Sequence, residues 1–554
     1  MNGRMMQMPL LVSSILHHAA RHHGDTEVVS RRVEGDLHRT TFAQVARRAA
    51  QVANALQMLG VVAGDRVATI AWNGYRHLEL YYGVSGSGAI LHTINPRLHL
   101  DQLVYIVNHA DDRVLCFDTT FAPLAAALAP RCPGVKHWIV MTDAEHRPAS
   151  MNPSVRNYED LVNAASADYT WPQFDENTAS SLCYTSGTAG NPKGVLYSHR
   201  STVLHTYASA LPDALCLSAT DVLLPVVPMF HVNAWGLPYA ALMVGAKLVF
   251  PGPQLDGASL YDLFEREKVT CAAGVPTVWQ GLLAYVRDKG LQFSTMRRTV
   301  IGGSACSPAM IATFEDDYHV RVLHAWGMTE LSPVGSVSVE KAKHRNASVT
   351  ERRALQAKQG RGVFGIDMKI VDPEGHELPW NGASAGDLWV RGVWTVASYF
   401  EPPGAVADGD GVSNNAGLVD GWFATGDVAT IDADGYMHIT DRSKDVIKSG
   451  GEWISSIAIE NIAVAHPGVA MAACIGVAHA KWDERPLLIV VRKPDSTVDR
   501  EEILAFFDGK IAKWWRPDDV VFVESIPLGG TGKMLKVKLR EQFRGYKLAS
   551  EPTR

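Results

Sequence analysis

Apolar residues recur along most of the chain with two alternating spacings. Segments with helical spacing, such as residues 42–59, alternate with short apolar runs at residues 67–72, 114–117, 137–141 and 247–250. A short apolar run bounded by turn residues is typical of a strand that is buried on both faces. Alternation of such strands with helices predicts βαβ units and a largely parallel sheet, and therefore an α/β fold.

The pattern changes near residue 360. Short strands at residues 368–371, 388–390 and 437–439 are separated by Gly, Asp and Pro turns, which predicts an antiparallel subdomain. Residues 405–421 are rich in Gly, Asp and Asn and are expected to form a surface loop. The final part of the chain returns to helix and strand alternation, so a small C-terminal α+β unit is expected.

The segment GRGVFG at residues 360–365 has the literal form of a dinucleotide-binding fingerprint. That fingerprint requires a helix after its glycines, whereas a strand is expected here at residues 368–371. We interpret the segment as a turn that enters the antiparallel subdomain.

Two segments have the apolar character of an export signal or a membrane span. Residues 8–16 form a short apolar run, but no small-residue cleavage pattern follows and the run continues into an amphipathic helical pattern. Residues 222–246 contain no Asp, Glu, Lys or Arg and are long enough to cross a bilayer. Pro225, Pro228 and Pro238 would leave backbone groups unpaired in lipid. A buried strand, a loop and a buried helix are expected instead, with no integral membrane segment.

Composition narrows the class of protein further. A chain of 554 residues exceeds one compact core, so at least two domains are expected. A formal net charge of −6 gives no electrostatic reason to expect a nucleic-acid partner. The seven cysteines are scattered and form no CxxC pair, which favours free thiols in a reducing, cytoplasmic compartment and offers no zinc site. The histidines at positions 17, 18, 22 and 23 lack acidic or cysteine partners nearby, so a solvated helix face is favoured over a metal site.

The most informative stretch is YTSGTAGNPKG at residues 184–194. Its glycines permit close approach of the backbone to a ligand, and its Thr and Ser hydroxyls suit phosphate oxygens. It lacks the G-x-x-x-x-G-K-[ST] spacing of a Walker A loop, as does the glycine-rich stretch at residues 529–534. A phosphate-binding loop is favoured, and an ordinary Gly/Ser surface turn is the alternative.

This loop resembles the phosphate-binding loop of the acyl-adenylate-forming superfamily, which includes acyl-CoA synthetases, firefly luciferases and nonribosomal peptide adenylation domains. Six further segments are similar to the superfamily's motifs and follow in its order. They are PMFHVNAWG (228–236), GGSA (302–305), AWGMTE (325–330), GWFATGD (421–427), DRSKDVIKSGG (441–451) and PLGGTGK (527–533). The resemblance covers nearly the whole chain.

The resemblance implies an ATP-dependent acyl-CoA ligase, that is, an AMP-forming acid–thiol ligase. Such an enzyme forms an acyl-adenylate with release of pyrophosphate and then transfers the acyl group to CoA. ATP, Mg²⁺ and CoA are the implied cofactors and co-substrates. The implied domains are a large N-terminal adenylate-forming domain of mixed sheets, residues 1–443, and a small mobile C-terminal lid domain, residues 444–554. The superfamily often dimerises, so a homodimer is also considered.

The resemblance also assigns roles to single residues. Asp427 would bind the two ribose hydroxyls, Glu330 would hold a partly hydrated Mg²⁺ together with Thr185, and Lys533 would offset charge on the α-phosphate. The plainer alternatives are a turn aspartate, a solvent-facing helix-start glutamate and an exposed loop lysine. The implied catalytic residues are Lys533, Glu330, Thr185 and His231. The implied nucleotide-binding residues are Thr185, Ser186, Gly187, Thr188, Lys193, Gly303, Ser304, Ala305, Ala325, Trp326, Gly327, Met328, Thr329, Asp427, Arg442 and Lys533.

The resemblance also implies two further sets of functional residues. In the first, His231 would steer the carboxylate and Trp235 would gate the acyl tunnel, while a packed histidine and a core tryptophan are the alternatives. The implied acyl pocket is lined by His231, Val232, Trp235, Gly302, Gly327 and Pro333. In the second set, Lys444 occupies the hinge position about which the C-terminal domain rotates between the half-reactions. The implied hinge and CoA set is Lys444, Lys448, Gly450, Gly451 and Trp453, with an ordinary turn as the alternative for the glycine pair.

The chain departs from the superfamily pattern at two places. The residues LGG at 528–530 stand where relatives carry more hydroxyls before Thr-Gly-Lys, which predicts a more mobile loop. Ala458 stands where relatives often carry an acidic residue, and the nearby Glu460 is given no catalytic role.

The segments FHVNAW and WGMTE are most similar to those of medium- and long-chain fatty acyl-CoA synthetases and of 3-methylmercaptopropionyl-CoA ligases. A medium-chain or longer fatty acid is therefore the expected substrate, with 3-methylmercaptopropionate, an aryl acid or another small acid as alternatives. Three other classes fit less well. A P-loop ATPase needs a Walker lysine, a nicotinamide oxidoreductase needs a helix after its glycine fingerprint, and an inactive homologue should have lost Lys533, Glu330 or Asp427.

Overall fold

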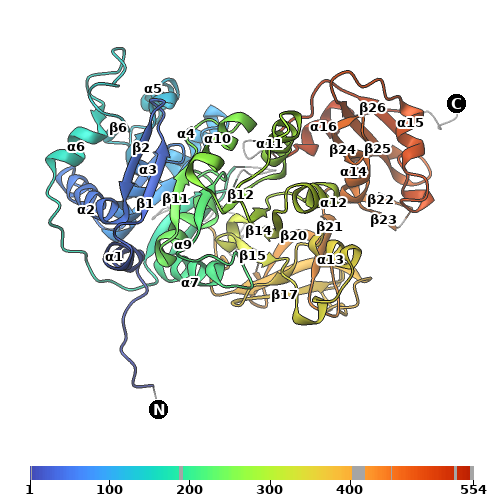
Figure 1. Ribbon diagram of the computed structural model, residues 1–554, viewed down its shortest axis with the longest axis horizontal. Helices are drawn as coiled ribbons and strands as arrows, with labels where there is room; N and C mark the ends of the chain where they lie inside the picture. Colours follow the sequence, from blue (N-terminus) through green and yellow to red (C-terminus); the bar gives the residue numbers. More distant parts are fainter. Residues whose placement is uncertain (2, 186–190, 402–417, 451, 530–532, 549–554) are drawn as a thin grey trace, which may run out of the picture.

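The computed structural model describes residues 1–554 except residues 2, 186–190, 402–417, 451, 530–532 and 549–554. Figure 1 shows a large N-terminal body, coloured from blue to yellow, beside a smaller C-terminal unit in red. The predicted mixed α/β architecture, with a large N-terminal part and a small C-terminal part, is confirmed.

Two large sheets form the framework of the N-terminal body. One has nine strands in the order β16-β15-β14-β13-β12-β10-β11-β1-β2, and the other has seven in the order β7-β6-β5-β3-β4-β8-β9. Most neighbouring strands are parallel, as predicted; the antiparallel pairs β1–β2, β14–β15, β15–β16 and β8–β9 lie toward the sheet edges. The strands of the first sheet are β1 (Glu27–Arg31), β2 (Leu37–Thr41), β10 (Val222–Pro225), β11 (Lys247–Phe250), β12 (Cys271–Gly274), β13 (Arg298–Ile301), β14 (Arg321–Gly327), β15 (Val334–Val337) and β16 (Arg361–Gly362). Those of the second are β3 (Arg66–Ile70), β4 (Ile90–Thr93), β5 (Asp112–Phe117), β6 (His137–Val140), β7 (Arg156–Asn157), β8 (Ala179–Tyr184) and β9 (Gly194–Ser198).

Helices cover these sheets and supply much of the apolar core. They are α1 (Val12–His22), α2 (Phe42–Met58), α3 (Tyr75–Gly86), α4 (Leu100–His109), α5 (Ala122–Leu128), α6 (Tyr158–Ala164), α7 (His199–Ala210), α8 (Val232–Trp235), α9 (Leu237–Val244), α10 (Gly257–Glu267), α11 (Pro276–Asp288), α12 (Pro308–Ala312) and α13 (Val349–Gln356). Helix α2 shows why the periodic segment at residues 42–59 is helical. Thr41 and Gln44 form a capping box at its start, and a Cβ at Gly83 of α3 would lie 2.6 Å from the Val52 side chain, so the two helices pack closely.

The segments considered for export or membrane insertion lie inside the fold. The apolar face of α1 is buried in the main core, while His17, His18 and His22 are exposed. Residues 222–246 form strand β10, a loop and helices α8 and α9, as predicted. Among the described residues, no helix is both long and apolar enough to cross a bilayer, and no group of three or more His, Cys, Asp or Glu side chains is placed to hold a metal ion.

An antiparallel sheet follows residue 360, as predicted. Its order is β17-β18-β20-β19, with β21 paired to β20. The strands are β17 (Ile366–Val371), β18 (Ala385–Gly392), β19 (Leu418–Val419), β20 (Trp422–Ile431) and β21 (Met437–Arg442). Several predicted segments differ from the observed elements at their edges. The run at residues 67–72 ends as a strand at Ile70, and Leu418 and Val419 of the predicted loop form β19 because they pair with Phe423 and Trp422. The rest of that loop lies largely outside the described residues.

The C-terminal unit is α+β, as predicted. It consists of β22 (Ile447–Ser449), β23 (Glu452–Ile454), α14 (Ser456–Val464), β24 (Val469–His479), β25 (Asp483–Arg492), α15 (Arg500–Phe506), β26 (Asp519–Phe522) and α16 (Lys536–Gln542). Glu460, for which no catalytic role was predicted, forms a buried ion pair with Lys536 at 2.7 Å. The unit is tied to the N-terminal body where the Asp441 carboxylate accepts hydrogen bonds from the backbone N–H and hydroxyl of Ser456, each at 2.6 Å.

Candidate active site

The candidate site lies where the carboxyl ends of several strands meet. The segment GGSA follows β13, and AWGMTE begins on the neighbouring parallel strand β14. Ligands of open α/β sheets bind outside the carboxyl ends of the strands. The two segments are in close contact, because a Cβ at Gly302 would lie 2.9 Å from the Ala325 carbonyl oxygen. Gly303 is half-buried, Ser304 is exposed and Ala305 is half-buried directly after the strand.

Asp427 is brought to the AWGMTE segment from the antiparallel sheet. The Trp326 indole N–H donates a hydrogen bond to Asp427 Oδ2 at 2.9 Å, although the two residues are far apart in the sequence. Asp427 on β20 faces Arg442 on β21, whose Nε lies 3.4 Å from Asp427 Oδ1. Asp427 is buried at 7% exposure, so its carboxylate is largely shielded from solvent.

Glu330 is buried and has a tyrosine partner that the sequence did not reveal. The Tyr399 hydroxyl donates to Glu330 Oε1 at 2.9 Å, and the Lys193 ammonium lies 4.7 Å from the centroid of the Tyr399 ring. Burial raises the pKa of Glu330, while the Tyr399 hydrogen bond and the charges of Arg442 and Lys193 act in the opposite direction. The Glu330 side chain therefore lies inside the site and does not face solvent.

The phosphate-loop hairpin is connected to the same segment. The Thr185 backbone N–H donates to the Lys193 carbonyl at 2.9 Å, and the Lys193 N–H donates to Thr185 Oγ1 at 3.3 Å. These bonds close the loop between β8 and β9. The Tyr197 hydroxyl of β9 donates to the Thr329 carbonyl at 2.7 Å, so the hairpin and AWGMTE are held side by side. Ser186, Gly187 and Thr188 lie outside the described residues.

Lys533 of the C-terminal unit reaches this cluster. A Cβ at Gly303 would lie 3.8 Å from Lys533 Cε. Burial and the charge of Arg442 lower the pKa of Lys533 to about 8, against the opposing effect of the charges of Asp427 and Glu330. The structure therefore gathers Lys533, Glu330, Asp427 and Arg442 from separate parts of the chain.

The predicted acyl-pocket residues border the same cluster. Trp235 is half-buried, and its ring lies against the glycine pair: a Cβ at Gly302 would come 3.3 Å from Trp235 Cη2. His231 is half-buried, and burial together with the Lys533 charge lowers its pKa to about 3, so its imidazole is neutral at ordinary pH. Val232 is buried in the main apolar core.

The backbone at Gly327 and Pro333 forms another part of this border. A Cβ at Gly327 would lie only 2.1 Å from the Pro333 carbonyl oxygen, so this position requires glycine. The same carbonyl accepts a hydrogen bond at 3.1 Å from the backbone N–H of Met328, a half-buried residue.

Comparisons with known proteins identify the family of this chain. The family model described as AMP-binding enzyme matches residues 16–400, and the AMP-binding enzyme C-terminal domain matches residues 458–533. The chain belongs to the AMP-binding enzyme family. It is 54% identical to a 3-methylmercaptopropionyl-CoA ligase of Ruegeria lacuscaerulensis, over 98% of this chain and 99% of that one. It is 52% identical to a medium-chain-fatty-acid–CoA ligase of Ectopseudomonas oleovorans, over 99% of each chain.

A solved structure supports the same fold. The anthranilate CoA ligase AuaEII in complex with anthranoyl-AMP superimposes with a TM-score of 0.85 at 25% identity, over 97% of this chain and 98% of that one. The predicted superfamily and the predicted class, an ATP-dependent acyl-CoA ligase of the acid–thiol type, are confirmed by the family match and these relatives.

The residues predicted for the hinge and for CoA fall into two places: Lys444 lies close enough to Arg442 and Asp427 for their charges to act on its pKa, whereas Lys448, Gly450 and Trp453 belong to the C-terminal unit. Figure 1 shows β22 and β23 on the C-terminal unit, away from β14. Arg442, Lys444 and Lys448 are exposed, and the Lys448 N–H donates to Glu484 Oε2 at 2.9 Å. Trp453 is half-buried and faces Lys448 across the β22–β23 pair. Gly451 lies outside the described residues.

A hollow next to Gly450 was not predicted from the sequence. Gly450 has a φ of 59°, and a Cβ there would lie 2.8 Å from the Trp482 ring, so a larger residue does not fit. The hollow has a volume of about 600 Å³ and is lined by Ser449, Gly450, His479, Trp482, Arg485, Trp514 and Asp518. Trp482 and Arg485 are close in the sequence, but Trp514 joins them only through the fold, so no local pattern marks all three as a group.

The lowered pKa of Lys533 predicts a pH limit on adenylation by this AMP-binding enzyme. The ammonium form is present below a pKa of about 8 and is lost above it. We expect kcat/KM for ATP in the adenylation step, which reports the free enzyme, to fall as pH rises through about 8. Arginine stays charged over this range, so the basic limb should be absent in Lys533→Arg. Measurement of pyrophosphate release from pH 6 to 10 in both enzymes tests this; a basic limb retained in Lys533→Arg would assign it to another group.

Proposed function

We propose that this acyl-CoA ligase activates an unbranched aliphatic carboxylic acid, with a medium-chain fatty acid as the first candidate. The observation that carries the proposal is the position of Trp235, whose ring lies on Gly302 and Gly303 beside the Lys533 side chain. An apolar ring next to the reacting centre favours an apolar acyl chain. The 52% identity to a medium-chain-fatty-acid–CoA ligase supports this choice.

A second candidate is 3-methylmercaptopropionate, which the 54% identity to a ligase of that name favours. This acid is also unbranched, with a thioether sulfur in place of one methylene of a short fatty acid. One apolar pocket therefore suits both substrates. Initial rates of AMP formation with butyrate, hexanoate, octanoate, decanoate, benzoate and 3-methylmercaptopropionate distinguish them. The proposal predicts the highest kcat/KM for an unbranched aliphatic acid, and a clear preference for benzoate would overturn it.

In the proposed first half-reaction, a carboxylate oxygen bonds to the α-phosphorus of ATP and the bond from that phosphorus to pyrophosphate breaks. Asp427 would orient the ribose through its two carboxylate oxygens, and Lys533 would offset negative charge on the α-phosphate. Neutral His231 would donate a hydrogen bond to the substrate carboxylate. The Thr185–Lys193 hairpin would enclose the phosphates.

Glu330 and Thr185 fit the requirements of a magnesium site. Mg²⁺ prefers oxygen ligands and usually keeps several waters, and both side chains offer oxygens. Glu330 is the stronger candidate, because burial raises the pKa of its carboxyl and a divalent cation would offset the cost of holding that group ionised. When bound, the ion would neutralise charge on the phosphates that leave as pyrophosphate.

In the second half-reaction the CoA thiol attacks the acyl carbonyl and AMP leaves. We propose a domain boundary at residues 443/444, with rotation about Lys444 bringing Gly450 and Gly451 to the site. The hollow beside Gly450 would then receive part of CoA, because its tryptophan rings suit stacking and its arginine suits phosphate. The seven free cysteines support a reducing, cytoplasmic location.

The proposed role of Trp235 gives a prediction about chain length. Each methylene in an apolar pocket contributes about 1–3 kcal/mol to discrimination. Trp235→Ala should therefore change the ratio of kcat/KM between hexanoate and decanoate by about tenfold. Tyr207→Ala, which removes an exposed aromatic ring, serves as the matched control. An unchanged ratio in Trp235→Ala would make Trp235 a packing residue only.

A further inference from the structure

The segment that carries His231 and Trp235 follows an unusual backbone path. Val232, Asn233, Ala234 and Trp235 have φ values of 46°, 49°, 49° and 58°, and Gly236 continues at 75°. Helix α8 is therefore a single left-handed turn. Residues with a Cβ are strained in this conformation, and a β-branched residue such as Val232 especially so. Such a path persists only where the surroundings hold it in place.

Asn233 holds this turn from within the core. It is 3% exposed, and both the nitrogen and the oxygen of its amide group form hydrogen bonds. Its Nδ2 donates to Ser181 Oγ at 2.9 Å, and its Oδ1 accepts from Thr93 Oγ1 at 3.2 Å and Cys183 Sγ at 3.5 Å. Thr93 and Cys183 face each other on the neighbouring strands β4 and β8. One side chain thus fastens the turn to two strands of the seven-stranded sheet.

Asn73 holds the other end of the same segment. It is 4% exposed, and its Nδ2 donates to the carbonyls of Pro225 and Val227 at 2.8 and 2.9 Å. Its Oδ1 accepts from the Met229 N–H at 2.6 Å. One amide therefore satisfies three backbone groups at the end of β10 and in the loop that follows it.

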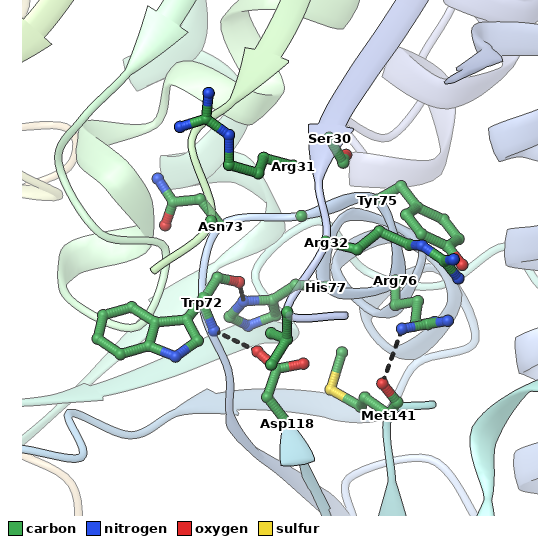
Figure 2. A pocket seen from close by; sticks show the side chains of 13 residues that line it. Ser30, Arg31, Arg32, Trp72, Asn73, Tyr75, Arg76, His77, Asp118 and Met141 are labelled. Carbon is green, nitrogen blue, oxygen red and sulfur yellow. Dashed lines mark hydrogen bonds between the residues drawn. The ribbon is translucent and has the colours of Figure 1, made fainter. Parts of the chain in front are cut away.

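The backbone next to Asn73 is itself held by hydrogen bonds. Figure 2 shows Asn73 next to Trp72 at the edge of a small cavity, with the Trp72 backbone bonded on both sides. The Trp72 N–H donates to Asp118 Oδ2 at 2.7 Å, and the Trp72 carbonyl lies 3.1 Å from His77 Nδ1. The Tyr81 hydroxyl adds a bond to the Met229 carbonyl at 2.5 Å. The loop before His231 is consequently held by Asn73, from the turn between β3 and α3, and by Tyr81 of α3.

We propose that Asn73 and Asn233 are positioning residues that set the geometry of the acyl pocket. The inference rests on the proposed function, in which Trp235 borders the acyl chain. Asn73 fixes the approach to His231, and Asn233 fixes the left-handed turn that places Trp235 on Gly302 and Gly303. Strand β8, which carries two partners of Asn233, leads directly into Thr185. The Asn233 amide therefore also fixes the acyl pocket relative to the phosphate loop.

The test separates the effect of the Asn233 amide group from the effect of the backbone conformation at this position. Glycine adopts the left-handed conformation freely, so Asn233→Gly keeps the turn accessible and removes only the side-chain bonds. We expect the hexanoate-to-decanoate ratio of kcat/KM to change about three- to tenfold. KM for the acid should rise, while KM for ATP should stay within about twofold. Asn233→Asp, which keeps an oxygen that can accept from Thr93 and Cys183, should lie closer to the parent enzyme. Asp495→Gly, an exposed left-handed residue with φ of 62°, is the matched control.

Two further variants keep the test independent of folding at position 233. Thr93→Val removes one partner of the Asn233 amide while preserving side-chain shape, and Asn73→Asp removes the two donor bonds to Pro225 and Val227. Both should change the hexanoate-to-decanoate ratio of kcat/KM in the same direction as Asn233→Gly. If the folded variants among these three leave the ratio at the parent value, the proposal is wrong.

The double variant Asn233→Gly/Trp235→Ala shows whether Asn233 acts through Trp235. If it does, Asn233→Gly should not change the ratio further once Trp235 is alanine; independent, multiplicative effects would overturn the proposal. A failure of the underlying function is recognised separately. If the proposed function is wrong, Trp235→Ala alone leaves the ratio unchanged. If only the positioning role is wrong, Trp235→Ala changes the ratio and Asn233→Gly does not.

Discussion

Replacing Lys533 with alanine is expected to reduce the rate of adenylation by about 10²–10³-fold. Loss of one preorganised electrostatic contact to charge in a transition state typically costs about 3–4 kcal/mol. Lys533 is the group from the C-terminal unit that reaches Gly303, and its pKa responds to Asp427 and Glu330. KM for ATP and for the acid should change little, because other residues bind the substrates. Pyrophosphate release under saturating conditions measures this loss.

The second half-reaction provides the internal control for Lys533. After the proposed rotation, this lysine lies away from the phosphate, so the variant should convert preformed acyl-AMP and CoA to thioester at close to the parent rate. Lys538→Ala, which removes an exposed lysine on α16, should leave both half-reactions intact. A loss of thioester formation equal to the loss of adenylation would show that Lys533 serves folding or both steps.

Replacing Lys444 with proline is expected to block the enzyme between its two half-reactions. Proline fixes φ near −65°, and the proposed pivot must change its backbone angles as the C-terminal domain turns. Adenylation should continue, because the structure already places Lys533 at the site. Thioester formation should slow by about tenfold or more, a loss of at least 1.4 kcal/mol in the barrier, so acyl-AMP should accumulate. Quenched-flow separation of acyl-AMP from acyl-CoA measures the two steps.

Lys444→Ala is the matched control, since it removes the same side chain but leaves φ free. It should retain most of the thioester-forming activity. Equal loss of both half-reactions in Lys444→Pro, with parent activity in Lys444→Ala, would place the pivot elsewhere in the chain.

Local patterns predicted most of the framework, because they depend on neighbouring residues alone. The apolar run at residues 247–250 matches β11 at both ends, since the strand is buried and bounded by turn residues. The run at residues 67–72 was extended too far for a related reason. Trp72 is apolar enough to continue the pattern, but Asn73 and Gly74 turn the chain before α3, and β3 ends at Ile70.

Features that depend on tertiary contacts could not be predicted in the same way. The motifs indicated Asp427 and Trp326 separately, and the fold alone joins them by a hydrogen bond. Tyr399 belongs to no predicted motif, and its contact with Glu330 requires two segments that are distant in sequence. The left-handed turn is even harder to predict, because Val232 is a residue type that avoids that conformation. Its cause lies in the Asn233 amide and the strands that bind it.

The nature of the nucleotide product tests the central claim most directly. The purified enzyme is incubated with hexanoate, ATP, Mg²⁺ and CoA, and all nucleotides and phosphates are quantified against the acyl-CoA formed. An acyl-adenylate mechanism predicts one AMP and one pyrophosphate for each thioester, with pyrophosphate release retained in the first turnover when CoA is omitted. Stoichiometric ADP and inorganic phosphate would contradict the mechanism and the roles of Lys533, Glu330 and Asp427 that depend on it.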